Sequence, residues 1–227
     1  MSALATAEIE SLVRSHRRQL YALFETLSPE QWLTQSLCGE WRVRDLAAHL
    51  VIATEASTAR VAKLMARHRC GFDEAMTHGV AQMADLSTVA VCELLRSHQA
   101  RVVAPPVIGV RSPLMDIVVH TFDACIPLGL PFEIDPTAYP DSLNFLNSSL
   151  MRRQFKCRIP NSQVLVATDV EWNSRTGSSE ASSHGSSGGV GRAQPALEAT
   201  AAQLLMALSG RDPVVLGQPT PLSKFFV

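Results

Sequence analysis

The sequence lacks the features that mark membrane-spanning and nucleic-acid-binding proteins. No apolar run among its 227 residues reaches the ~20 residues that cross a bilayer. The N-terminus carries acidic residues early and has no basic stretch before an apolar segment, which argues against a signal peptide. Lys and Arg form no concentrated run and the formal net charge is −1, so no field suits a phosphate backbone. We therefore expect a cytoplasmic protein that binds neither membrane nor nucleic acid.

Paired cysteines are also missing. The five cysteines are widely spaced, odd in number and never two residues apart in a C-x-x-C motif, so neither a disulfide framework nor a cysteine-type zinc site is indicated. We expect most of them to be small buried hydrophobic residues. Cys125 is the cysteine of most interest, because it follows the candidate site described below.

Helical periodicity dominates the first two thirds of the chain. Apolar residues recur every three or four positions and predict long helices over about 5–26, 43–69, 73–102 and 112–126. The third helix is interrupted near Ser87, which can cap its second part, and the fourth is expected to begin with Ser112 as N-cap. Arg14, Arg17 and Arg18 are predicted to form a solvated face of the first helix. Four long helices with short connections predict a four-helix bundle.

The pattern changes after residue 132. We expect residues 1–132 to form the bundle and residues 133–227 to form a small α+β region. That region is predicted to contain a helix over 135–150, a strand over 163–169 and a helix over 195–208. Residues 173–192 are so rich in Ser and Gly that they are predicted to form a mobile loop.

An acidic residue stands four positions before a histidine in four places, where chance would give fewer than one. On a helix this spacing puts the two side chains next to each other on one face. Context favours Asp116 and His120, because they lie in an otherwise apolar helix where burying a charge without a partner is costly. The other three pairs are Asp45/His49, Glu74/His78 and Glu180/His184. Asp45 is explained by its place in the first turn of a helix, where a carboxylate is favourable.

His49 lies on the apolar side of the second predicted helix, and it completes a set of two histidines and one carboxylate with Asp116 and His120. These ligands suit Zn²⁺ and also Ni²⁺, Fe²⁺ or Mn²⁺. Three protein ligands leave an open coordination position for water or substrate, which is typical of catalytic metal sites. A histidine satisfied within the core is the alternative interpretation of His49.

Five segments of the sequence occur in the order found in a known family. They are 27–32 (LSPEQW), 41–50 (WRVRDLAAHL), 116–131 (DIVVHTFDACIPLGLP), 166–172 (VATDVEW) and 207–211 (ALSGR). Together they resemble the mycothiol-dependent maleylpyruvate isomerase family of the DinB-like metalloenzyme superfamily. The resemblance implies a DinB-like four-helix bundle with a small C-terminal α+β extension. It also implies that His49, Asp116 and His120 bind a divalent metal, usually taken as zinc.

The chemistry implied by the resemblance is thiol activation. A metal lowers the pKa of a bound thiol, and the resulting thiolate is the nucleophile. We therefore expect an enzyme that activates mycothiol or a similar thiol for isomerisation or S-transfer on a small electrophilic substrate. The alternatives are a DinB-like hydrolase in which the metal activates water, and a non-catalytic metal-binding bundle. The sequence is compatible with a monomer or a homodimer.

Three further residues are candidates for supporting roles. Asp123 falls on nearly the same helix face as His120 and can orient that histidine when it binds a metal. A hydrogen bond at the helix end is the alternative role for Asp123. Arg211 and Arg192 are candidates for binding a carboxylate of the substrate, although surface arginines are common in proteins.

Overall fold

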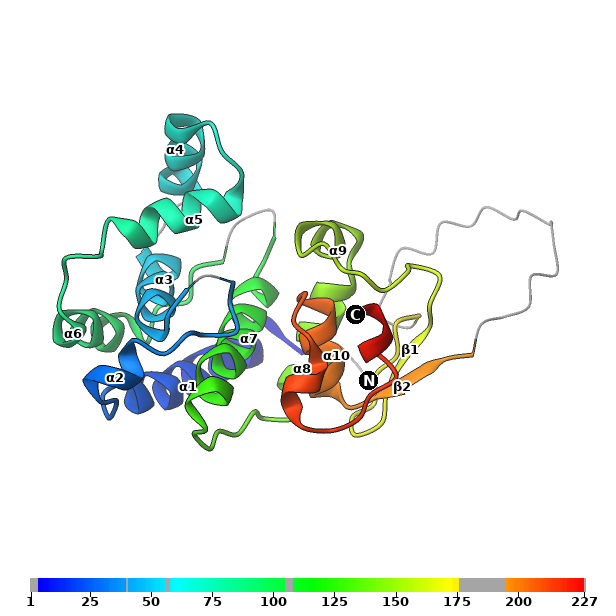
Figure 1. Ribbon diagram of the computed structural model, residues 1–227. Helices are drawn as coiled ribbons and strands as arrows, with labels where there is room; N and C mark the ends of the chain where they lie inside the picture. Colours follow the sequence, from blue (N-terminus) through cyan, green and yellow to red (C-terminus); the bar gives the residue numbers. More distant parts are fainter. Residues whose placement is uncertain (1–3, 40, 56–57, 105–107, 176–194, 227) are drawn as a thin grey trace. The chain divides into compact units, whose positions relative to one another are not determined.

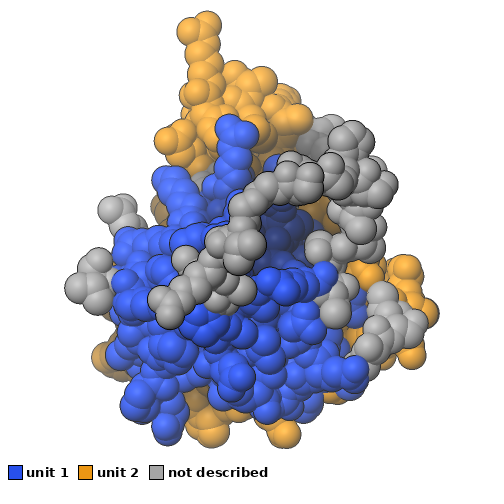
Figure 2. Space-filling view, turned by 90° about the vertical axis from the view of Figure 1, so that its right-hand side faces the viewer, with its two compact units in different colours: residues 1–3, 136–227 blue, residues 4–135 orange. Residues whose placement is uncertain are grey.

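The computed structural model describes residues 4–39, 41–55, 58–104, 108–175 and 195–226. The chain divides into two compact units, one of Leu4–Asp135 and the other of Pro136–Val227 with Met1–Ala3 (Figure 2). In its described residues the first unit contains helices α1 to α7, and the second contains three more helices and two short strands. None of the described helices is long and apolar enough to cross a membrane.

Four helices of the first unit form the bundle: α1 (Thr6–Phe24), α3 (Val43–Glu55), α6 (Thr88–His98) and α7 (Arg111–Leu128). α1 packs against α6 and α7, and α3 packs against the same two helices, so each helix has two neighbours in the bundle (Figure 1). Their buried faces carry the core, which includes Phe24, Leu46, Leu95 and Ile117. The predicted DinB-like four-helix bundle is confirmed.

A helical hairpin is inserted between α3 and α6. Residues predicted as parts of two long helices form α4 (Thr58–His68) and α5 (Phe72–Ala81), which pack against each other. α5 also packs on α3 (Figure 1), where Ile52 and Met76 belong to one apolar cluster. Only the part of the third predicted helix that Ser87 caps belongs to the bundle. The Ser87 hydroxyl accepts a hydrogen bond from the backbone N–H of Ala90, as predicted.

Helix α7 begins earlier and ends later than the sequence predicted. Its N-cap is Val110 rather than Ser112, which leaves Pro113 in the first turn, where a backbone N–H has no partner within the helix. At the other end Pro127 lies inside the helix and cannot donate to the carbonyl of Asp123. The N–H of Leu37 donates to that carbonyl instead, at 3.1 Å. The helix therefore continues to Leu128 and holds the loop that precedes α3.

The short helix α2 (Pro29–Trp32) lies between α1 and α3 in the sequence. Ser28 and Gln31 form a capping box, in which each side chain bonds the backbone of the other residue. Trp32 is buried and its ring lies 5.5 Å from that of Phe24 on α1, so it is a core residue.

The second unit is the small α+β extension. Helices α8 (Ala138–Asn147) and α9 (Ser149–Gln154) precede strand β1 (Leu165–Ala167). After the undescribed residues, strand β2 (Leu197–Ala199) pairs with β1 in parallel and α10 (Ala201–Leu208) packs on α8. The short 3₁₀ helices η1 (Pro213–Leu216) and η2 (Ser223–Phe225) end the unit.

Two sequence-based predictions for this unit need correction. Residues 195–208 are not one helix, because Leu197 and Ala199 are buried on one face of β2 and the capping box of Thr200 and Gln203 begins α10 only at Ala201. The helix predicted over 135–150 is likewise divided at Ser148, which caps α9. Of the predicted mobile loop, Asn173 bridges to Val166, whereas 176–194 lie outside the described residues.

Candidate metal centre

Two bundle helices bring His49, Asp116 and His120 together. The Nε2 atoms of His49 on α3 and of His120 on α7 each lie 3.3 Å from Oδ1 of Asp116. The two imidazole rings are 4.9 Å apart and meet edge to face. One ligand atom from each residue lies within 4.8 Å of the other two. The structure therefore brings together the three residues predicted to bind a metal, and metal binding itself stays a prediction.

The local sequence explains why these polar groups face inward. Residues on all sides of α7 are buried, among them Leu114, Ile117 and Val118, so polar side chains on this helix meet protein rather than water. The spacing of four residues puts Asp116 and His120 on one face, and α3 supplies His49 opposite them. The histidines are buried, whereas the Asp116 side chain is 21% exposed. The centre is therefore reached from the side of its carboxylate.

Asp123 lies behind His120. Its Oδ2 is 2.8 Å from Nδ1 of His120, and its side chain is 0% exposed. A carboxylate at Nδ1 fixes the ring so that Nε2, which faces Asp116 and His49, carries the lone pair when the imidazole is neutral, as a metal ligand is. The supporting role predicted for Asp123 agrees with this arrangement.

The charges at the centre are strongly coupled. Burial disfavours the charged form of Asp116, but the nearby charges of His120 and His49 outweigh it and hold the pKa of the carboxyl well below its usual range. Burial likewise disfavours protonated His120, yet Asp116 and Asp123 raise its pKa to about 9. Without a cation, the protein thus retains a proton where a metal would sit.

The donor set suits a divalent metal. Two imidazole nitrogens and one carboxylate oxygen converge from rigid helices, a combination that binds zinc and other first-row metals. The buried Nδ1 of His49 has no hydrogen-bond partner in the described residues, which leaves Nε2 as the nitrogen of His49 that takes part in the site. The ring of Trp41 lies 5.0 Å from that of His49 and covers this side of the centre.

Cys38 also lies beside the centre, which the sequence analysis missed. Its sulfur, a nitrogen of His120 and a carboxylate oxygen of Asp123 all lie within 4.8 Å of one another. The bond from Leu37 to the Asp123 carbonyl places Cys38 there. Cys125, which the sequence had favoured, is completely buried, and burial raises the pKa of its thiol to about 11. The other four cysteines are only partly buried, contrary to expectation.

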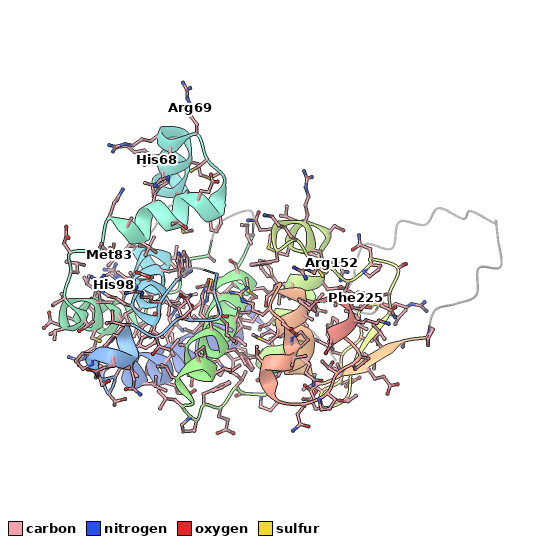
Figure 3. All side chains as sticks on the ribbon, viewed as in Figure 1. His68, Arg69, Met83, His98, Arg152 and Phe225 are labelled. Atoms are coloured by element: carbon pink, nitrogen blue, oxygen red, sulfur yellow. The ribbon has the colours of Figure 1, made fainter. Side chains whose placement is uncertain are left out.

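The other acid/His pairs take no part in the centre. Asp45 lies in the first turn of α3, as predicted, and it accepts a hydrogen bond from the backbone N–H of Arg42 at 3.0 Å. His78 stacks on His68, which Figure 3 labels on α4, with ring centroids 3.9 Å apart. Glu180 and His184 lie outside the described residues.

Of the two arginines proposed for substrate binding, Arg192 lies outside the described residues and Arg211 belongs to the second unit, where its Nη1 donates to the carbonyl of Ser209. In the first unit, Arg17 contradicts the predicted solvated face. It is 1% exposed, and Tyr21, one helical turn further along α1, is 3% exposed. The spacing of Arg17 from Val13 and Leu20 was the available signal, since it places the guanidinium within the apolar stripe of α1.

A mainly helical chain with this bundle and these inward-facing groups defines a class, the DinB-like four-helix bundles. Residues 13–125, which run from within α1 to within α7, match the family model described as the mycothiol maleylpyruvate isomerase N-terminal domain. The chain belongs to this family. Comparisons with curated proteins and with solved structures gave no match.

Proposed function

We propose that this protein is a metal-dependent enzyme that activates a low-molecular-weight thiol, mycothiol or a similar compound, for isomerisation or S-transfer on a small electrophilic substrate. The observation that carries the proposal is the convergence of His49, Asp116 and His120 within 4.8 Å. Membership of a family named for a mycothiol-dependent isomerase supports the choice of thiol. We further propose a cytoplasmic location, which agrees with the five cysteines, all of them among the described residues, forming no disulfide.

In this proposal His49, Asp116 and His120 hold a divalent metal, with zinc the first candidate. Bound there, the metal would lower the pKa of a thiol and so supply a thiolate at neutral pH. His49 and His120 present Nε2 to the site, and Asp116 supplies the negative charge that favours a cation.

Asp123 acts through His120 rather than on the substrate. By accepting a hydrogen bond from Nδ1–H of His120 it keeps the imidazole in the tautomer and orientation that present Nε2 to the site. The buried side chains around α7 exclude bulk water from the inner side of the centre, which preserves the strength of these interactions.

Metal content tests the centre itself. Protein purified without added metal should contain close to one equivalent of metal by elemental analysis, and His49→Ala and Asp116→Ala should each lose it. His78→Ala is the matched control, because His78 also follows an acid by four residues but lies on α5. A metal content that neither substitution at the centre changes would refute the site.

Thiol transfer to an electrophilic test substrate, with and without mycothiol, tests the chemistry. We expect turnover only with the thiol and the metal together. Hydrolysis without any thiol would instead favour the water-activating enzyme. Bound metal without either activity would favour a non-catalytic bundle.

A further inference from the structure

Buried polar atoms without partners are concentrated on α1. Among the described residues of the first unit, four buried side-chain atoms have no hydrogen-bond partner: Nε2 of His16, Nε of Arg17, Oη of Tyr21 and Nδ1 of His49. Three of them come from less than two turns of one helix. Folded proteins pair nearly all buried polar groups, so such a concentration needs a specific reason. A ligand that these groups bind would provide one.

Arg17 is the most costly of these groups. Its Nη1 donates to the backbone carbonyl of Arg101, whereas Nε has no partner. None of the ion pairs found in the described part of the chain includes Arg17. A buried guanidinium with one neutral partner is destabilising unless an anion compensates its charge.

Arg14, one turn earlier on the same helix, provides a comparison. It donates to the carbonyl of Ala100, next to the one that Arg17 contacts, and it also pairs with Glu10 at 2.7 Å. Both arginines therefore tie the same loop to α1. Only Arg14, which is partly exposed, has a carboxylate partner, so holding the loop does not explain why Arg17 is buried without one.

Tyr21 connects Arg17 with the candidate metal centre. It follows Arg17 by four residues, so the two side chains lie on the same face of α1. α1 packs along α7, which carries Asp116. Burial raises the pKa of Tyr21, while the charge of Arg17 lowers it and that of Asp116 raises it. Tyr21 therefore lies on the face of Arg17 and on the helix that packs against the helix of Asp116.

We propose that Arg17 and Tyr21 form a receptor for a carboxylate group of the ligand that reacts at the His49, Asp116 and His120 centre. This inference rests on the proposed function, which it deepens by assigning the α1 face to substrate recognition. The free Nε edge of a guanidinium suits the two oxygens of a planar carboxylate, and the Tyr21 hydroxyl can donate a further hydrogen bond. One negative charge would also compensate the one buried positive charge.

The chemistry favours a carboxylate over a phosphate. A phosphate dianion would bring one negative charge more than the single buried charge of Arg17 compensates. Binding of inorganic phosphate therefore distinguishes a phosphate receptor from a carboxylate receptor. Succinate is a suitable carboxylate probe, because each of its two carboxylate groups carries a single negative charge and it has no thiol or electrophile.

Calorimetric titration of the full chain with succinate, at constant metal content, tests the proposal. We expect Arg17→Met to weaken succinate binding about 10- to 100-fold, as loss of a charged hydrogen-bonding partner does, and Tyr21→Phe about 2- to 10-fold. The matched control Arg14→Met should change binding less than twofold. Inorganic phosphate should bind more weakly than succinate to the unaltered protein.

Measurements of thermal stability distinguish a role of Arg17 and Tyr21 in ligand binding from a purely structural role. Tyr21→Phe removes a buried hydroxyl that has no partner, so its midpoint of thermal unfolding should be equal to or above that of the unaltered protein. Arg17→Lys provides a folded variant if Arg17→Met does not fold, and it should still weaken succinate binding because ammonium lacks the bidentate edge.

Three outcomes would overturn the proposal. They are absence of succinate binding to the unaltered protein, equal effects of Arg17→Met and Arg14→Met, and tighter binding of phosphate than of succinate. Elemental analysis of the same samples shows whether the metal centre is intact. Failure of the carboxylate receptor is therefore distinguishable from failure of the proposed metal function.

Discussion

Each unit contains a buried arginine, and the protein satisfies the hydrogen-bond donors of these two guanidinium groups to different degrees. Arg152 of α9, labelled in Figure 3, is 8% exposed and all three of its nitrogens donate, to the side chains of Asn161 and Asn147 and to the carbonyl of Ile159. Arg17 of the bundle is less exposed still, yet its Nε has no partner. An arginine buried for stability has its donors satisfied by the protein, as Arg152 does. Incomplete satisfaction at Arg17 therefore indicates a role beyond stability.

The largest expected effect is at Arg152. Arg152→Met should lower the free energy of unfolding by about 3 kcal/mol, because three acceptors, among them the buried carbonyl of Ile159, lose their donor at once. Chemical denaturation measures this change. Arg153→Met is the matched control, since Arg153 is an exposed neighbour on the same helix and its substitution should have little effect. Similar stabilities of the two variants would remove the contrast between Arg152 and Arg17.

The next largest effect is expected on metal affinity, at Asp123. This buried carboxylate is hydrogen-bonded to His120 and so influences the candidate centre. Asp123→Asn should weaken metal binding about 10- to 100-fold, as loss of a carboxylate behind a metal-binding histidine does. Competition with a chelator measures the affinity. Asp45→Asn is the control, because Asp45 caps α3 and makes no contact with the centre. An unchanged affinity in Asp123→Asn would show that the bond to His120 is only structural.

The pH dependence of the metal-free protein gives a smaller effect. The pKa of His120 is raised to about 9 from 6.5, so its protonated form contributes stability fully below about 6.5, and this contribution is lost as the pH rises through 9. The lowered pKa of Asp116 gives the opposite dependence, with stability present above its ordinary 3.8 and lost as the pH falls below that value.

Urea denaturation in the presence of a chelator should therefore show the unfolding free energy falling by on the order of 1 to 2 kcal/mol between pH 6.5 and 9. Asp116→Asn should make this decline smaller, because His120 then loses one of its two charged partners and keeps only Asp123. His78→Gln should leave the decline intact. A decline of the same size in Asp116→Asn would assign it to other groups.

The smallest effect on stability is expected at the Ser87 hydroxyl, a hydrogen-bonded polar group near the surface. Ser87→Ala removes the hydroxyl that accepts the N–H of Ala90 at the start of α6, and it should lower the unfolding free energy by about 1 kcal/mol. Ser87→Asn is the control, because asparagine also caps well. Equal losses in the two variants would show that the cap itself contributes nothing.

The sequence predicted the bundle and the residues of the candidate centre because both depend on regular spacing. Apolar residues at intervals of three and four mark the packed faces, and the interval between Asp116 and His120 is one helical turn. The break at Ser87 between α5 and α6 was predicted, whereas the division of the second predicted helix into α3 and α4 escaped prediction, since the inserted hairpin repeats the same periodicity.

Contacts that depend on a loop or on burial escaped prediction as well. Cys38 comes to His120 only because Pro127 leaves a carbonyl of α7 open to the preceding loop, which no spacing rule reveals. Arg17 was grouped with Arg14 and Arg18 because all three are basic and close in sequence. Its position in the apolar stripe carried more information than its charge.

Asp123 forms hydrogen bonds with two partners, one through its side chain and the other through its backbone carbonyl. Its side chain contacts His120, and its backbone carbonyl accepts the N–H of Leu37 because Pro127 cannot donate to it. Substituting the Asp123 side chain can therefore change the pKa and orientation of His120 while the loop stays in place. Replacing Pro127 would instead provide a second N–H donor for the Asp123 carbonyl and weaken the attachment of the loop alone. The strength of the histidine's support and the position of the neighbouring cysteine are thus adjustable by independent mutations, although they meet at a single residue.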